Sequence, residues 1–227
     1  MITKYRKLLA PLVLTLLVLL LAGCGSSGSG EEVPEAPDKV QSQALALPYT
    51  LEEGRLVVEN VFQYSGMNPD RNNEEGTEIA ALEVRNASVL HLNRAELTLT
   101  VDGGEEIAFV VEDLPAGAAV MVFSRENQTM DEGSEREITC KADFSEASPL
   151  ARERVTVETD GAEVTVSNVS GEAMKNVKVY CHSLLEDSCY GGRTYCYTID
   201  QLDAGADATV EATDCYLDGA LPVRIEG

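Results

Sequence analysis

Several residue types that carry chemistry in other proteins are scarce or missing in this chain of 227 residues. It has no Trp, only four Phe and only two His, so few aromatic side chains could stack on sugars or bases. His91 and His182 lie far apart in the sequence, and no Gly-x-Ser-x-Gly motif is present, so a serine hydrolase is not indicated. We expect no enzymatic activity, no cofactor and no metal site.

Basic residues are few as well. The chain has 17 Lys and Arg against 39 Asp and Glu, which gives a formal net charge of −22. A surface this acidic repels the phosphates of nucleic acid, and no basic stripe in the sequence offsets it. We therefore expect no nucleic-acid partner.

The N-terminus combines basic residues with an apolar run over 8–22. That run, of about 15 residues, fits the hydrophobic region of a signal peptide and is shorter than the roughly 20 residues needed to span a bilayer. It ends in Leu21-Ala22-Gly23-Cys24, which resembles the lipobox of bacterial lipoprotein precursors. The resemblance implies that residues 1–23 are a cleaved signal peptide and that Cys24 is lipidated. The expected location is a bacterial cell membrane, on the extracytoplasmic side, and the lipid is the expected contact with the membrane.

A flexible linker is expected between the anchor and the folded part. Residues 25–30 are only Gly and Ser, and residues 31–37 add charge and two prolines. Such a segment has no side chains with which to build a core. Residues 24–46 are therefore interpreted as the lipidated Cys with a disordered linker.

The remaining residues predict an all-β fold. Short segments rich in Val, Leu and Thr alternate with Gly, Asp and Asn turns, and no later stretch keeps a helical apolar period over three turns. Closely spaced short strands are typical of a sandwich or barrel. The expected strands are 56–58, 79–84, 95–101, 107–111, 119–123, 155–157, 164–166, 177–179, 195–199 and 208–211.

The two halves of this region look like one unit repeated. Asn86-Ala87-Ser88 matches Asn168-Val169-Ser170 at an offset of 82, and 114–118 matches 202–206 at an offset of 88. Six residues are therefore inserted in the central hairpin of the second copy. A strand that ends in Asn-x-Ser, followed later by a Leu-x-Ala-Gly turn, resembles the small immunoglobulin-like domains of bacterial surface lipoproteins, such as FxLYD-type domains. The resemblance implies two tandem immunoglobulin-like β-sandwich domains, at 47–146 and 147–227.

Five cysteines follow Cys24, and an extracytoplasmic location favours disulfides among them. A two-residue Gly103-Gly104 turn in the first copy would place residues 99 and 108 opposite each other, and the offsets then place Cys181 opposite Cys196. We predict that these two form a disulfide. The pairs Cys189–Cys196 and Cys140–Cys215 are alternatives, and a zinc site is a weaker one because the spacings miss the usual Cys-x(2–4)-Cys pattern.

Tyrosine is concentrated in the second copy, which contains five of the eight in the chain. Tyr195 and Tyr197 align with expected core positions, whereas Tyr190 precedes Gly191-Gly192 in the inserted loop. A Tyr on a Gly-containing loop is typical of a recognition surface, so Tyr190 is the predicted contact with a protein partner of the cell envelope. An accessory or spacer subunit with no ligand of its own is the alternative function. The acidic segment 70–76 lacks the Gly and Glu positions of a calcium loop and is expected to be solvated.

Overall fold

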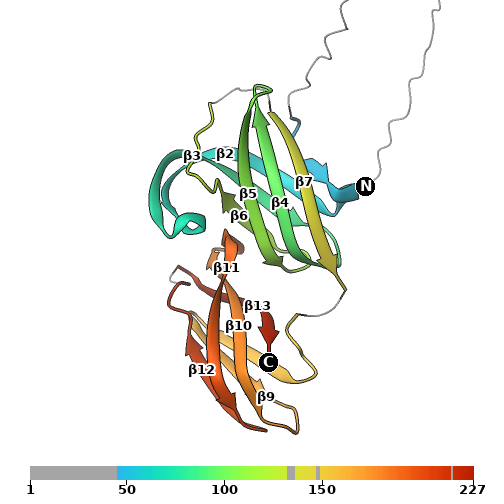
Figure 1. Cartoon of the computed structure of the whole chain (residues 1–227), viewed down its shortest axis with the longest axis vertical. Helices are drawn as coiled ribbons and strands as arrows, with labels where there is room; N and C mark the ends of the chain where they lie inside the picture. Colours follow the sequence, from blue (N-terminus) through green and yellow to red (C-terminus); the bar gives the residue numbers. More distant parts are fainter. Residues whose placement is uncertain (1–44, 132–135, 147–148, 216) are drawn as a thin grey trace, which may run out of the picture. The chain divides into compact units, whose positions relative to one another are not determined.

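Thirteen strands and two short 3-10 turns make up nearly all of the secondary structure in the computed structural model, which describes residues 45–131, 136–146, 149–215 and 217–227 (Figure 1). The prediction of an all-β chain is confirmed, and its character is that of a β-sandwich. Within these ranges no helix has the length and apolarity that crossing a membrane requires. The predicted signal peptide, Cys24 and most of the linker lie outside the described residues.

The strands range in length from three to fifteen residues. Those of the first half are β1 (Tyr49–Leu51), β2 (Leu56–Asn68), β3 (Glu74–Asn86), β4 (His91–Val101), β5 (Glu105–Leu114), β6 (Ala119–Phe123) and β7 (Arg136–Ser145). Those of the second half are β8 (Val155–Asp160), β9 (Glu163–Asn168), β10 (Met174–Leu185), β11 (Ser188–Leu202), β12 (Asp207–Glu211) and β13 (Gly219–Glu226). The 3-10 turns are η1 (Glu52–Gly54) and η2 (Pro69–Arg71).

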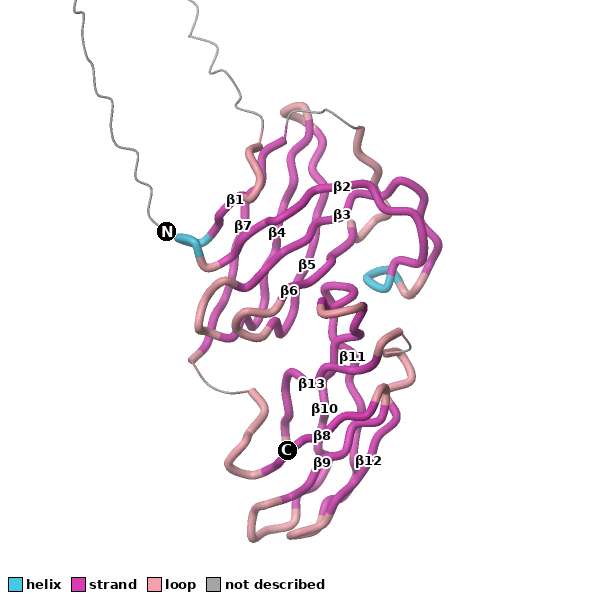
Figure 2. The backbone as a smooth tube through the Cα atoms, turned by 180° about the vertical axis from the view of Figure 1, so that it is seen from behind, coloured by secondary structure: helices cyan, strands magenta, loops and turns pink. Residues whose placement is uncertain are grey.

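The strand order repeats between the two halves. In the first half β2, β3 and β6 lie side by side, and a separate sheet has the order β5-β4-β7. In the second half β8, β9 and β12 lie side by side, and β11, β10 and β13 are neighbours in the same way (Figure 2). All of these pairs are antiparallel. The repeat seen in the sequence is thus also a repeat of topology.

The two Asn-x-Ser motifs form the same corner in both halves. Asn86 Nδ2 donates to the carbonyl oxygens of residues 90, 114 and 115, and Asn168 Nδ2 donates to those of residues 172, 202 and 203. Each Asn Oδ1 accepts a hydrogen bond from the backbone N–H two residues later, which makes an Asx-turn. Gly117 and Gly205 complete the two corners with φ of 78° and 72°.

One parallel strand pair joins the two halves. Cys189 and Tyr190 of β11 pair with Val120 and Met121 of β6, and this pairing is parallel. The result is a seven-stranded sheet with the order β1-β2-β3-β6-β11-β10-β13. The six residues inserted in the second copy lengthen the β10–β11 hairpin, which therefore reaches β6.

Each half has its own hydrophobic core. The first contains the alternate residues of β4 and β5, such as Leu97, Leu99 and Phe109, and the second contains Val164, Val166 and their neighbours. Apolar residues at every second position place their side chains on one face of a strand.

The predicted register of the first hairpin is wrong by one residue. Leu99 pairs with Ile107, and the turn contains three residues, 102–104, because Val101 pairs with Glu105. In the second copy Cys181 accordingly pairs with Tyr195, and Cys196 pairs with Tyr180. Successive residues of a strand point to opposite faces, so Cys181 is buried and Cys196 is exposed.

The remaining described cysteines are distributed between the two cores. Cys140 and Cys189 pack with the first core, and Cys215 is buried with Cys181 in the second. All five are free thiols in the structure. The predicted Cys181–Cys196 disulfide is therefore not formed in this structure, and Cys140 and Cys215 belong to different cores.

Candidate functional site

The tip of the β10–β11 hairpin, residues 182–193, docks on the first half of the chain and builds the site. Its backbone pairs with β6, and Cys189 belongs to the first core although it comes from the second half. We call this segment the hairpin tip. The site lies where it meets β4, β5, β6 and the turn η2.

Tyr190 secures the hairpin tip and is not a surface residue. Its side chain is only 6% exposed and packs edge-to-face on Phe123, with ring centroids 5.3 Å apart. Its hydroxyl donates to the carbonyl oxygen of Met67 at 2.8 Å and accepts from the Tyr64 hydroxyl at 2.6 Å. The prediction of an exposed Tyr190 is wrong, because an amphipathic side chain at the tip finds both an apolar pocket and two polar partners.

The turn η2 prepares the surface on which the hairpin tip docks. Asn68 ends β2, its side chain accepts a hydrogen bond from Asp70 N–H at 2.9 Å, and Pro69 follows at the first position of the turn. Asn, then Pro, is a favourable start for a helical turn. Asn72 leaves the turn with a left-handed φ of 53°, which Asn tolerates better than most residues.

Asp70 is the central acceptor of the junction. Its Oδ1 accepts from the backbone N–H groups of Gly192 at 2.8 Å and Arg193 at 3.2 Å, and its Oδ2 accepts from Phe123 N–H at 3.0 Å. Burial raises the pKa of the Asp70 carboxyl to about 6, although these three hydrogen bonds and the charge of Arg193 act in the opposite direction. The expectation that this acidic segment is solvated is wrong for Asp70, which is 7% exposed.

Two glycines allow the close approach of the hairpin tip. A Cβ at Gly191 would lie 2.7 Å from Pro69 Cγ, and Gly191 has a φ of 89°. A Cβ at Gly192 would lie 1.9 Å from the carbonyl oxygen of Val110. The Gly-Gly pair is therefore required by packing, and not by loop flexibility.

Two further polar contacts hold the halves together. His182 is fully buried, and its Nε2 donates to the carbonyl oxygen of Glu112 at 2.7 Å. Burial lowers the pKa of His182, which favours the neutral form of the ring. Arg224 of β13 binds both carboxylate oxygens of Asp113 through Nε, each at 3.1 Å, and His91 Nε2 lies 3.5 Å from Asp113 Oδ1.

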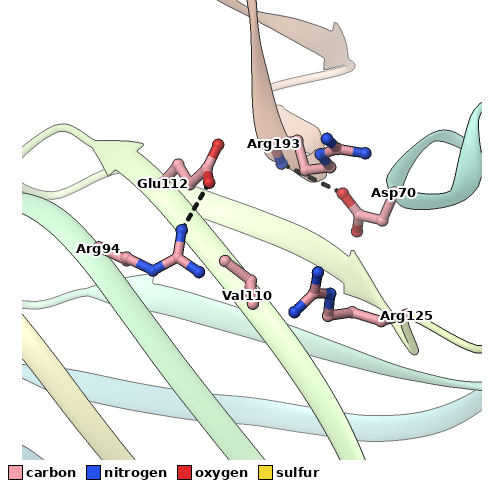
Figure 3. A pocket seen from close by; sticks show the side chains of 6 residues that line it. All are labelled: Asp70, Arg94, Val110, Glu112, Arg125 and Arg193. Carbon is pink, nitrogen blue, oxygen red and sulfur yellow. Dashed lines mark hydrogen bonds and ion pairs between the residues drawn. The ribbon is translucent and has the colours of Figure 1, made fainter.

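A pocket with three arginines lies beside this junction. Its volume is about 180 Å³. Arg94 comes from β4, Arg125 follows β6, and Arg193 belongs to the hairpin tip. Figure 3 shows the guanidinium groups of Arg94 and Arg125 pointing toward each other across Val110. The pocket is lined by Asp70, Arg94, Val110, Glu112, Arg125 and Arg193.

The three arginines differ in their partners. Arg94 is held by carboxylates, with Nη1 2.7 Å from Glu112 and Nη2 3.2 Å from Glu96. Arg125 and Arg193 are exposed, and within the described part of the chain neither forms a salt bridge. Their guanidinium groups can therefore bind an incoming anion with charge-assisted hydrogen bonds.

A second pocket, of about 350 Å³, shares Arg193 with the first. It is lined by Pro69, Asn72, Asn73, Arg193, Thr194, Tyr195 and Asp214. Its walls offer amide, hydroxyl and aromatic groups, together with the carboxylate of Asp214. The two pockets thus differ in character, because three arginines line the first and mostly uncharged polar side chains line the second.

The sequence did not indicate the arginine pocket. Its arginines are 31 and 68 residues apart (125 − 94 and 193 − 125). Arg94 and Arg125 both lie against β5, and the docking of the hairpin tip adds Arg193. The sequence contains one local feature of this site, because Asn68-Pro69 is a favourable start for the turn η2. Among the described residues no three His, Cys, Asp or Glu side chains are grouped as metal ligands.

No protein-family model matches the sequence, and no curated protein matches it either.

Proposed function

We propose that this chain is a bacterial lipoprotein, anchored by lipid at Cys24 on the extracytoplasmic side of the cell membrane, that binds a protein partner and catalyses no reaction. Membrane anchoring at Cys24 is supported by the N-terminal basic stretch, the apolar run and Leu21-Ala22-Gly23-Cys24. The repeated strand order and the two identical Asn corners support tandem immunoglobulin-like domains.

The binding role rests on one observation, the gathering of three arginines at one pocket of a chain with a formal net charge of −22. Like charges repel, and an acidic chain has ample carboxylate with which to neutralise its arginines. Arg125 and Arg193 nevertheless present their guanidinium groups to solvent. Such an arrangement favours recognition of an anionic group, since structural arginines are normally paired.

The pocket carboxylates support a role without catalysis. Asp70 is occupied by three backbone N–H groups, and Glu112 is paired with Arg94. A general base must be within reach of a substrate proton and free to accept it. Neither carboxylate has that freedom.

A spacer is the second candidate function, and the junction between the halves favours it. The hairpin tip is held by strand pairing, by Tyr190 and by Asp70, and Arg224 binds Asp113. So many directional contacts restrict bending between two domains, which is the property that a rigid spacer needs.

Lipid labelling in a bacterial host tests whether the chain is anchored to the membrane through Cys24. Cells that express the full chain are grown with radiolabelled palmitate and fractionated, beside cells that express Cys24→Ser. We expect label and membrane association for the natural chain only. Equal membrane association of both chains would refute anchoring at Cys24.

The binding role is tested by affinity capture from solubilised envelope with the full chain. The test variant combines Arg125→Ala with Arg193→Ala. The matched control is Arg85→Ala, which changes a half-buried arginine of β3 that pairs with Glu59. If the chain is a binding protein, the double variant alone should fail to capture a specific partner. If it is a spacer, the natural chain, the double variant and the control should capture the same proteins.

A further inference from the structure

The charge of the arginine pocket suits a single negative charge. Three guanidinium groups and the two carboxylates of Asp70 and Glu112 line it, which gives a local formal charge of 3 − 2 = +1. A monoanion neutralises this formal charge, whereas a phosphate or sulfate dianion would leave a formal charge of 1 − 2 = −1 in the pocket of an already acidic protein. The surrounding acidic surface adds to this discrimination.

The pocket is large enough for one small anionic group, but too small for a whole metabolite. Its volume of about 180 Å³ is below the roughly 300–1,000 Å³ of typical small-molecule sites. It corresponds to about six water molecules at ~30 Å³ each. A carboxylate with one or two attached carbons fits this space.

The second pocket can accommodate the part of the ligand that is attached to the carboxylate. It begins at Arg193, so a chain bound through its carboxylate beside Arg193 can continue along Asn72, Thr194 and Tyr195. Amide and hydroxyl side chains can bond peptide N–H and C=O groups, and a Tyr ring supplies apolar contact.

We infer that the two pockets bind an extended peptide that carries a carboxylate, with the carboxylate between Arg125 and Arg193 and the adjoining residues along the second pocket. This inference rests on the proposed function and names the chemistry that the partner presents. The carboxylate belongs either to the C-terminus of the partner or to an Asp or Glu side chain. Arg94, held by Glu112, acts as a positioning residue that keeps Glu112 away from the ligand.

The test is a peptide selection on the full lipidated chain, immobilised in detergent. Three pools of random N-acetylated octapeptides are applied and the retained peptides are counted by mass spectrometry. The first pool has a free C-terminal carboxylate and no Asp or Glu, the second has an amidated C-terminus and one internal Glu, and the third has neither. Competition with acetate and with inorganic phosphate is measured in parallel.

We expect the first or the second pool to be retained at least about tenfold better than the third, and the retained pool identifies the source of the carboxylate. Arg125→Ala and Arg193→Ala should each lower retention about tenfold, whereas Arg85→Ala should not. Arg125→Gln, which keeps polar bulk without charge, should behave like Arg125→Ala. Circular dichroism checks that each variant retains its β-structure.

Three results would overturn the inference. These are equal retention of all pools, retention that does not depend on Arg125 or Arg193, and saturable binding of phosphate without binding of any peptide. If no peptide pool is retained but capture from the envelope still depends on Arg125 and Arg193, the proposed binding function remains supported. Only the inference that the partner presents a carboxylate is then wrong. If peptides bind but capture is independent of the arginines, the pocket binds carboxylate and the proposed use of this pocket by the partner is wrong.

Discussion

Gly192 lies so close to Val110 that a Cβ on residue 192 would come within 1.9 Å of the Val110 carbonyl oxygen. These residues belong to different halves of the chain, and their contact exists only because the inserted residues lengthen the β10–β11 hairpin. Val110 is also the floor of the arginine pocket. The packing that joins the halves therefore also shapes the candidate binding site (Figure 3).

Substitution Gly192→Ala should separate the hairpin tip from the first half. The Val110 oxygen is backbone, so it cannot move aside as a flexible side chain could, and we expect a loss of at least about 2 kcal/mol in the free energy of unfolding. Hydrogen exchange should become faster at residues 188–193. The matched control is Gly104→Ala, where a Cβ would meet nothing within 4 Å. Unchanged exchange in Gly192→Ala would contradict this account of the junction.

Substitution Tyr190→Phe should weaken the junction without affecting partner binding. It removes the hydrogen bonds to Met67 and Tyr64, each of which contributes about 1 kcal/mol, while the ring can still pack on Phe123. Urea denaturation should show a decrease of about 1–2 kcal/mol. Tyr180→Phe is the control, since the Tyr180 hydroxyl bonds Glu226 at the protein surface. Loss of the partner with unchanged stability would restore Tyr190 as a contact residue.

The local features of the fold could be read from the sequence. Segments rich in Val, Leu and Thr between Gly, Asp and Asn turns predicted the strands, and the repeated Asn-x-Ser motif predicted a unit that recurs in both halves. Both depend on neighbouring residues only. The register of the first hairpin could not be read with certainty, because Asp102-Gly103-Gly104 accommodates either a two-residue or a three-residue turn.

The candidate site depends on contacts between distant residues, and this is why the sequence did not reveal it. Tyr190 was placed at the surface because it stands next to two glycines, but those glycines permit close packing on Pro69 and Val110. Arg94, Arg125 and Arg193 have no common spacing. Arg94 and Arg125 both lie against β5, and the pairing of β11 with β6 adds Arg193 to them.

Thiol labelling should separate the cysteines by burial. Cys196 is exposed, whereas burial raises the pKa of Cys181 and Cys189 to about 12, which keeps these thiols protonated at neutral pH. Iodoacetamide applied to the folded chain without reductant should modify Cys196 first among the described cysteines. Peptide mapping without reductant tests the alternative. A Cys181–Cys196 disulfide would leave Cys196 unmodified and would require the β10–β11 register to shift by one residue.

Substitution Arg224→Ala should destabilise the junction at neutral pH. It leaves the buried carboxylate of Asp113 without its guanidinium partner, at a cost of about 3 kcal/mol. Burial raises the pKa of Asp113, but the hydrogen bonds to His91 and Arg224 and their charges outweigh burial and hold that pKa below its ordinary value. The contribution of the pair is therefore present above about pH 4 and is lost as the pH falls through the lowered pKa. Arg85→Ala, which breaks the exposed pair with Glu59, should cost less than about 1 kcal/mol and serves as the control.

Asp70 should make stability depend on pH in the opposite direction. Its pKa is raised to about 6, so between pH 4 and pH 6 the folded chain binds a proton that the unfolded chain has released. The stabilisation is complete below the unfolded pKa of about 4 and is lost as the pH rises through 6. Compared with Asp70→Asn, whose residue 70 does not titrate, the natural chain should lose on the order of 3 kcal/mol between pH 4 and pH 7.

A ¹³C titration of the Asp70 carboxyl gives the direct measurement, with an expected midpoint near pH 6. The charged groups that line the pocket with Asp70 are Arg193 from β11, Arg125 after β6, Arg94 from β4 and Glu112 from β5. Protonation of Asp70 changes their formal sum from +1 to +2, so carboxylate peptides should also bind more tightly below pH 6, as long as the peptide remains ionised. A midpoint below pH 4 would mean that the three backbone N–H groups outweigh burial. In that case Asp70 would stabilise the junction as a permanent anion, and neither stability nor peptide binding would change between pH 4 and pH 7 on its account.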